Sequence, residues 1–333
     1  MRRALVIILL SLGTCASGQS FQTTVQPEPA ENLAHECHYD LTLVDKKHTV
    51  EGLVVLYDRG PQITSFYSDA EVGAFASRHA LALLLAHQCN SKNAPGGPEE
   101  MDMDPTHGIG RALFKAIDQF AVQSAHPELS SAGLILLGFS GTGALFAHFE
   151  EYAPRRVIAA VLIHPAHYEP MSLDHVQLSS EGIEVPELIF AGGTDKIATT
   201  QAPYDYFLRF REKGAPWTFL VQNQTNHFGV STTKPLILAW LDDVIPLRKP
   251  STNRPLQRIN QSDSWEGYIA RCTPDHIPAA TWNVCGSTIA KGASATPKNM
   301  LPAGWLPSKH VADLWLDMTR QSNPHKDIGA ESP

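Results

Sequence analysis

The chain has 333 residues, of which 43% are hydrophobic and 18% are charged, and its formal net charge at neutral pH is −8. This length and composition are typical of a globular protein with a large core. The negative charge argues against nucleic acid as a partner, because binding to phosphates needs a basic face.

The first eighteen residues have the pattern of an export signal. Arg2 and Arg3 precede an apolar run over 4–12, and small residues follow at 16–18. The run is shorter than the roughly 20 apolar residues of a membrane-spanning helix. The pattern therefore predicts a cleaved secretory signal over 1–18, no stable membrane insertion, and a secreted or periplasmic protein. Two alternatives stay open: an uncleaved anchor, or a lipoprotein attached through Cys15.

Strand and helix patterns alternate along the next part of the chain. Alternation of this kind implies helical crossovers between parallel strands, so we expect an α/β domain over 19–249 with a mostly parallel sheet and helices on both faces. The expected strands are 39–43, 51–57, 80–87, 133–137, 157–163, 187–191 and 217–222, and the expected helices are 72–79, 110–124, 143–152, 204–213 and 232–244.

Residues 250–333 break the alternation. Segments 268–272 and 281–285 could pair as a hairpin, and 311–318 has the pattern of a closing helix. About 80 residues with few apolar runs make a small core. We therefore expect a C-terminal extension that packs on the main domain.

Four cysteines remain after removal of the signal: Cys37, Cys89, Cys272 and Cys285. An even number in an exported chain favours disulfides, with three possible connectivities. The preferred pair is Cys272 with Cys285, because it closes a short local loop, which leaves Cys37 with Cys89. A metal at 35–38 (His-Glu-Cys-His) would need a second ligand pair at metal-like spacing, which the sequence lacks. We expect neither a metal nor a cofactor.

Three residues with catalytic chemistry each follow an expected strand. Ser140 comes after 133–137, Asp195 after 187–191 and His227 after 217–222. In an open α/β sheet, ligands bind beyond the carboxyl ends of the strands. A serine hydroxyl becomes a nucleophile when a histidine takes its proton and an acid orients that histidine. The pattern predicts a nucleophile at Ser140, a base at His227 and an orienting acid at Asp195.

The segment 138–143, Gly-Phe-Ser-Gly-Thr-Gly, places the serine on a tight strand-to-helix turn. With the chain order Ser, Asp, His, it resembles the nucleophile elbow of the α/β-hydrolases over about residues 39–247. The resemblance implies the α/β-hydrolase fold and an oxyanion hole to which the Gly141 N–H contributes. The sequence departs from the motif at Thr142, where a glycine is usual.

The second oxyanion donor should come from the turn over 57–62, Tyr-Asp-Arg-Gly-Pro-Gln. Pro61 has no N–H, so Arg59, Gly60 and Gln62 are the candidates, and we assign Gly60. A carboxylate at Asp58 would oppose an oxyanion unless it points away or pairs with Arg59.

These features predict a serine hydrolase that cleaves a carboxylic ester through an acyl-enzyme. Only some twenty residues separate the strands ending at 163 and starting at 187, which leaves no room there for a large lid. We therefore expect small-molecule or polymer-borne esters as substrates. A peptidase or amidase with the same triad and an inactive hydrolase-fold binding protein are the alternatives. His164 and His167 also follow a strand, and we expect them to be structural.

Overall fold

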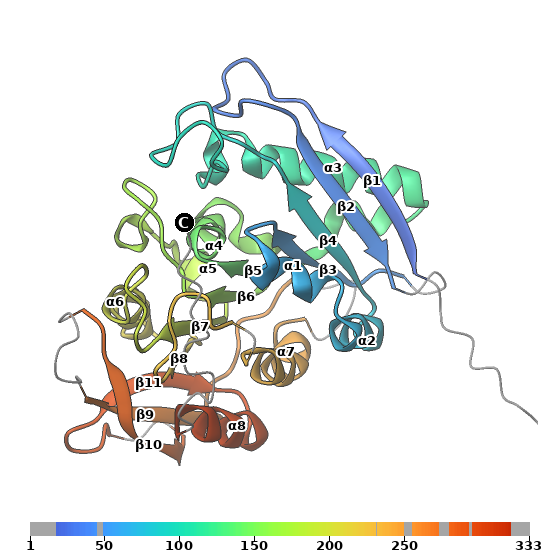
Figure 1. Ribbon diagram of the computed structural model, residues 1–333. Coiled ribbons are helices and arrows are strands. Elements are labelled where there is room, and N and C mark those ends of the chain that lie inside the picture. The colour runs from blue at the N-terminus through green and yellow to red at the C-terminus, as the bar shows by residue number, and fades with distance from the viewer. Residues whose placement is uncertain are drawn as a thin grey trace, which may run out of the picture.

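The computed structural model describes residues 18–44, 49–230, 232–249, 255–272, 280–292 and 295–320 (Figure 1). The predicted signal at 1–18 falls almost entirely outside these residues. Within them the strands form one 11-stranded sheet in the order β1-β2-β4-β3-β5-β6-β7-β8-β11-β9-β10. The strands are β1 Gln19–Val25, β2 Cys37–Leu43, β3 Gly52–Tyr57, β4 Leu81–His87, β5 Gly133–Phe139, β6 Val157–Ile163, β7 Glu187–Gly192, β8 Thr218–Gln222, β9 Trp265–Cys272, β10 Asn283–Lys291 and β11 Leu301–Leu306.

The centre of the sheet is parallel. β4, β3, β5, β6, β7 and β8 pair in parallel, whereas β1 with β2 and β2 with β4 pair antiparallel. Every residue of β6 is buried, as its continuous Val-Ile-Ala-Ala-Val-Leu-Ile run requires of a strand covered on both faces. The predicted α/β class with a mostly parallel sheet is confirmed.

Helices pack on the sheet along its whole length (Figure 1). In the layout that Figure 1 shows, α3 packs on β1 and β2, α4 on β5 and β6, α7 on β6, and α8 on β8 to β10. None of the helices in the described ranges is long and apolar enough to cross a membrane. The helices are α1 Pro61–Tyr67, α2 Ala70–Arg78, α3 Ile109–Ser124, α4 Gly141–Tyr152, α5 Ser180–Ile183, α6 Gln201–Arg211, α7 Lys234–Arg248 and α8 Lys309–Arg320.

The C-terminal residues continue the sheet. β9 and β10 pair antiparallel, which confirms the predicted hairpin, and α8 confirms the predicted helix. β11, which the sequence pattern did not predict, pairs with both β9 and β8 and so joins the hairpin to the parallel strands. The buried indole of Trp315 on α8 donates a hydrogen bond to the Phe219 carbonyl of β8 (2.8 Å). The hairpin and helix therefore share a core with the central sheet.

The cysteines pair differently from the preferred prediction. Cys37 on β2 forms a disulfide with Cys89, just after β4, as predicted for that pair. The predicted Cys272–Cys285 bond is wrong, because both are free thiols. Asn283 stands opposite Cys272, and a register shift at Cys285 interrupts the ladder between β9 and β10. Burial, followed by the neighbouring Cys285 thiol, raises the pKa of Cys272 to about 11.

Candidate active site

Ser140 occupies a sharp elbow between β5 and α4. Its backbone has φ 54° and ψ −124°, a strained conformation for a residue with a side chain. The elbow needs a glycine at 138, because a Cβ there would meet the Thr142 carbonyl oxygen at 2.5 Å. Thr142 itself braces the turn: its hydroxyl accepts from the Phe139 N–H (3.0 Å) and donates to the Phe139 carbonyl (2.9 Å). The departure from the glycine motif at 142 thus supplies two hydrogen bonds to the elbow.

The structure brings Ser140, Asp195 and His227 together. The Ser140 Oγ lies 2.8 Å from His227 Nε2, and His227 Nδ1 lies 2.8 Å from Asp195 Oδ2. Asp195 is fully buried, and its Oδ1 accepts from the N–H groups of Ile197 and Ala198 (2.8 and 3.0 Å). Because the carboxylate accepts, the proton of a neutral His227 sits on Nδ1, which leaves Nε2 free to accept the Ser140 proton.

A nucleophile on a strand-to-helix elbow, with acid and base at later strand ends, is the arrangement of the α/β-hydrolases. The chain has the α/β-hydrolase fold. Each triad member sits at the carboxyl end of a central strand: Ser140 after β5, Asp195 after β7 and His227 after β8.

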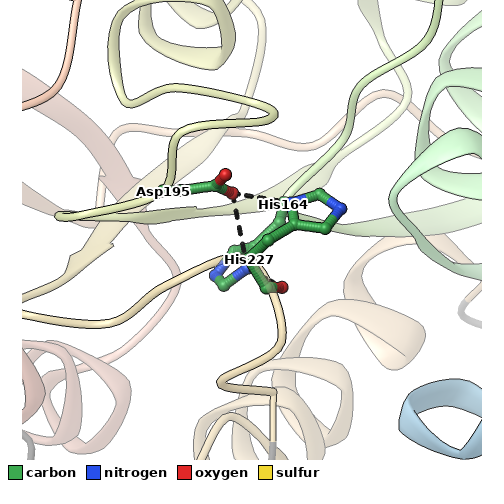
Figure 2. Close-up of side chains that lie close together, drawn as sticks. All are labelled: His164, Asp195 and His227. Atoms are coloured by element: carbon green, nitrogen blue, oxygen red, sulfur yellow. Dashed lines mark hydrogen bonds and ion pairs between the residues drawn. The ribbon is translucent and has the colours of Figure 1, made fainter. Parts of the chain in front are cut away.

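His164, which we expected from the sequence to be structural, is a fourth member of this cluster. It follows β6 directly and has no solvent-exposed surface. Figure 2 shows its ring beside Asp195 and His227, with Nδ1 3.8 Å from Asp195 Oδ2. The only signal in the sequence was its position at a strand end, which it shares with the triad. His164, Asp195 and His227 offer ligand atoms within 4.8 Å of one another, a donor set that suits zinc. Both nitrogens of His227 are, however, engaged with Asp195 and Ser140.

The turn after β3 does not supply the predicted Gly60 donor. The Gly60 N–H donates to Asp58 Oδ1 (3.0 Å), so it is committed within its own turn. Asp58 Oδ2 faces His87 Nδ1 (3.3 Å). Arg59 pairs with Glu100 instead (3.0 Å). Because the Gly60 N–H already donates to Asp58, the assignment of Gly60 as the second oxyanion donor is wrong.

Two other amides remain as candidate donors. The Gly141 N–H is the first of α4 and has no partner within the helix. Among the described residues, no backbone hydrogen bond uses the Arg59 N–H. The Arg59 side chain reaches Gly141, since its Nη2 would lie 3.4 Å from a Cβ at that glycine. The Gly141 amide is a candidate oxyanion donor by its position, and the Arg59 amide by having no other backbone partner in the described ranges.

The surroundings of the triad differ from one side to the other. Beside Gly141 lies a charged cluster of Arg59, Glu100 and His167, in which Glu100 Oε1 bonds to the arginine and faces His167 Nε2 (3.3 Å). Next to His227, Phe228 is 56% exposed and stands edge-on to the His227 ring, with ring centres 5.3 Å apart. Phe228 forms one wall of a groove of about 370 Å³, whose other lining residues are Pro61, Gln62, Ser65, Phe66, Asp69, Val230 and Lys234.

Several solved structures with a similar fold are esterases or other serine hydrolases. The fluorophosphonate-binding serine hydrolase F of Staphylococcus aureus is 15% identical, with 67% of this chain and 98% of that chain covered and a TM-score of 0.45. The S-formylglutathione hydrolase of Staphylococcus aureus is 13% identical, with 68% and 99% covered and a TM-score of 0.48. A ferulic acid esterase is 12% identical, with 67% and 97% covered and a TM-score of 0.46. No protein-family model and no curated protein sequence matches the chain.

Proposed function

We propose that the chain is a serine hydrolase that cleaves a carboxylic ester through an acyl-enzyme on Ser140. The observation that carries this proposal is the pair of 2.8 Å hydrogen bonds that links Ser140 through His227 to Asp195. Hydrogen-bond contact from nucleophile to base and from base to acid is the geometry that serine catalysis requires.

In the first half of the reaction, His227 Nε2 takes the hydroxyl proton as Ser140 Oγ attacks the ester carbonyl carbon. The bond to the alcohol oxygen then breaks, and the imidazolium gives its proton to that oxygen. In the second half, His227 deprotonates a water that attacks the acyl carbon. The bond to Ser140 Oγ then breaks, the acid leaves, and the imidazolium returns its proton to Oγ. Asp195 keeps the Nδ1 proton in place and stabilises the imidazolium.

The developing oxyanion would be held by the backbone N–H groups of Gly141 and Arg59. The first is supported by its place at the start of α4, where unpaired amides and the helix dipole favour negative charge. The second is supported by its freedom from other backbone bonds among the described residues.

The groove beside Phe228 supports a substrate with an apolar or aromatic substituent next to the ester. Its volume of about 370 Å³ is within the range of small-molecule sites. We propose small-molecule or polymer-borne esters as the substrate class. We also propose an exported protein, for which the Cys37–Cys89 disulfide is the support, since disulfides persist in oxidising compartments.

A matched substrate panel tests the proposal. p-Nitrophenyl esters and the corresponding anilides would be offered to the wild type, to Ser140→Ala and to Ser130→Ala, which removes an exposed hydroxyl elsewhere. We expect ester turnover in the wild type and Ser130→Ala alone, unchanged by a chelator. Anilide turnover that rivals ester turnover would favour the peptidase alternative. Turnover that survives Ser140→Ala, or that a chelator abolishes, would contradict a serine nucleophile.

A further inference from the structure

His164 is joined by hydrogen bonds to the segment that carries the catalytic base. Its Nδ1 lies 2.7 Å from the main-chain carbonyl oxygen of His227. Its Nε2 lies 2.9 Å from Oε1 of Gln222, the last residue of β8. Gln222 in turn donates through Nε2 to the Gly229 carbonyl (2.9 Å). The loop between β8 and α7 is thus held at two points, at the His227 carbonyl by His164 and at the Gly229 carbonyl by Gln222.

The backbone conformation of His164 is also fixed by its surroundings. Its φ of 45° lies in the left-handed region that few residues with side chains adopt. Its N–H donates to the Phe190 carbonyl of β7 (3.0 Å), which fixes the end of β6 against the strand that leads to Asp195. Strained backbone that is fixed by its surroundings is concentrated at functional sites.

The protonation of His164 follows from its burial and its partners. Burial lowers the pKa of His164, with Asp195 opposing part of that change. A neutral ring carries one proton, whereas both of its partners, the His227 carbonyl oxygen and Gln222 Oε1, accept. We place the proton on Nδ1, which makes the shorter of the two contacts (2.7 against 2.9 Å), where it holds the His227 backbone and also faces Asp195 Oδ2 at 3.8 Å. This is the same carboxylate oxygen that accepts from His227 (Figure 2).

We propose that His164 is a positioning residue for catalysis, which fixes the backbone of His227 so that its ring stays aligned between Ser140 and Asp195. This inference rests on the proposed hydrolase function. A base that drifts by about 1 Å can cost on the order of a hundredfold in rate, so the effect belongs in kcat rather than in substrate binding.

Three substitutions at one position separate this role from simple packing. Asn places an amide N–H near the position of Nδ1, Gln reaches instead toward the position of Nε2, and Leu removes both. We expect His164→Leu to lower kcat by about ten- to a hundredfold with KM within twofold. His164→Asn should recover most of that loss and His164→Gln little of it. His148→Leu is the matched control, because it removes a buried imidazole from the middle of α4, away from the triad.

The proton NMR spectrum supplies a readout that does not depend on turnover. The low-field signal of the proton between His227 and Asp195 should persist in the wild type, His148→Leu and His164→Asn, and should broaden or shift in His164→Leu and His164→Gln. If His164→Leu does not fold, the comparison of Asn with Gln decides. Equal kcat in Asn and Gln variants, or a Leu variant as active as the His148 control, would overturn the inference. A wild type that turns over no ester would instead refute the proposed function.

Discussion

The two ends of α4 hold two buried polar clusters that are built in opposite ways. At its N-terminal end, Ser140, His227 and Asp195 form a continuous chain in which each side chain has a partner. Near its C-terminal end, Glu150 and Glu187 lie together with no exposed surface, and three of their four carboxyl oxygens lack a hydrogen-bond partner among the described residues.

The second cluster favours neutral carboxyl groups, whereas the first is arranged for the proton transfer of the proposed reaction. Burial raises the pKa of Glu187 to about 8, and burial together with the neighbouring Glu187 raises the pKa of Glu150. Among the described residues, the Tyr206 hydroxyl donates to Glu187 Oε1 (2.8 Å). A buried carboxyl pair with this one donor is tolerated only while it keeps protons. Hydrogen-bond partners, rather than burial, therefore distinguish the proposed catalytic end of α4.

Removal of the nucleophile should have the largest effect on activity, and it should disturb only the N-terminal end of α4. We expect Ser140→Ala to lower kcat by on the order of 10⁴- to 10⁶-fold, because His227 then has no hydroxyl to activate. Its melting temperature should stay close to that of the wild type. Ester assays with thermal denaturation measure both. A hundredfold loss or less would place the reaction elsewhere.

Loss of the disulfide should have the next largest effect, and it tests how the loop beside the proposed active site is anchored. Cys89 begins the loop that carries Glu100 to the charged cluster beside Gly141. The bond closes a separation of 52 residues, so we expect Cys37→Ala with Cys89→Ala to lower the free energy of unfolding by about 4 kcal/mol. Urea titration measures it. The control is Cys272→Ala with Cys285→Ala, two thiols that are already free, where a comparable loss would contradict the assigned pairing.

The carboxyl pair at the other end should set a pH dependence of stability. Glu187 binds its proton more tightly when folded, with a pKa of about 8 against an ordinary 4.5. Its contribution to the free energy of unfolding is therefore complete below pH 4.5 and is lost as the pH rises through about 8. Glu187→Gln should melt several degrees above the wild type at pH 9 and close to it at pH 5, with kcat unchanged. Glu212→Gln, an exposed site with the same charge change, is the control. An equal gain in both variants would refute the role of burial.

The smallest expected effect concerns the groove. Phe228→Ala should raise KM for aryl esters by about fivefold and leave kcat nearly unchanged, because it removes apolar contact surface without touching the hydrogen-bond chain. Val122→Ala, on a side chain that is 83% exposed on α3, is the control. A fall in kcat with KM constant would show that Phe228 acts on His227 rather than on substrate.

The sequence predicted the parts of the fold that local patterns determine. Apolar runs such as β6 mark strands that are buried on both faces, and the residues after them define the candidate triad. β1 was missed because its Gln-Ser-Phe-Gln-Thr-Thr-Val sequence is mostly polar at an exposed edge. β11 was missed because Pro302 and Gly304 argue against a strand, whereas here they sit at a register shift and Gly304 adopts φ 100°.

The rest of the site depends on contacts between distant segments. The commitment of the Gly60 amide to Asp58 requires a turn geometry that Asp-Arg-Gly-Pro does not dictate. The His164 contact with His227 joins residues 63 positions apart, and a single histidine at a strand end does not predict it. The free Cys272 and Cys285 depend on a bulge in the hairpin, which spacing alone does not predict.

The most direct test of the account is covalent labelling with a fluorophosphonate, which reacts with serines that a neighbouring base activates. Intact mass and peptide mapping would follow the label in the wild type and in His227→Gln. The account predicts one phosphonyl group on Ser140 in the wild type and labelling at least a hundredfold slower in the variant, since the 2.8 Å contact to Nε2 is lost. A folded wild-type protein that takes up no label, or a label on another serine, would contradict it.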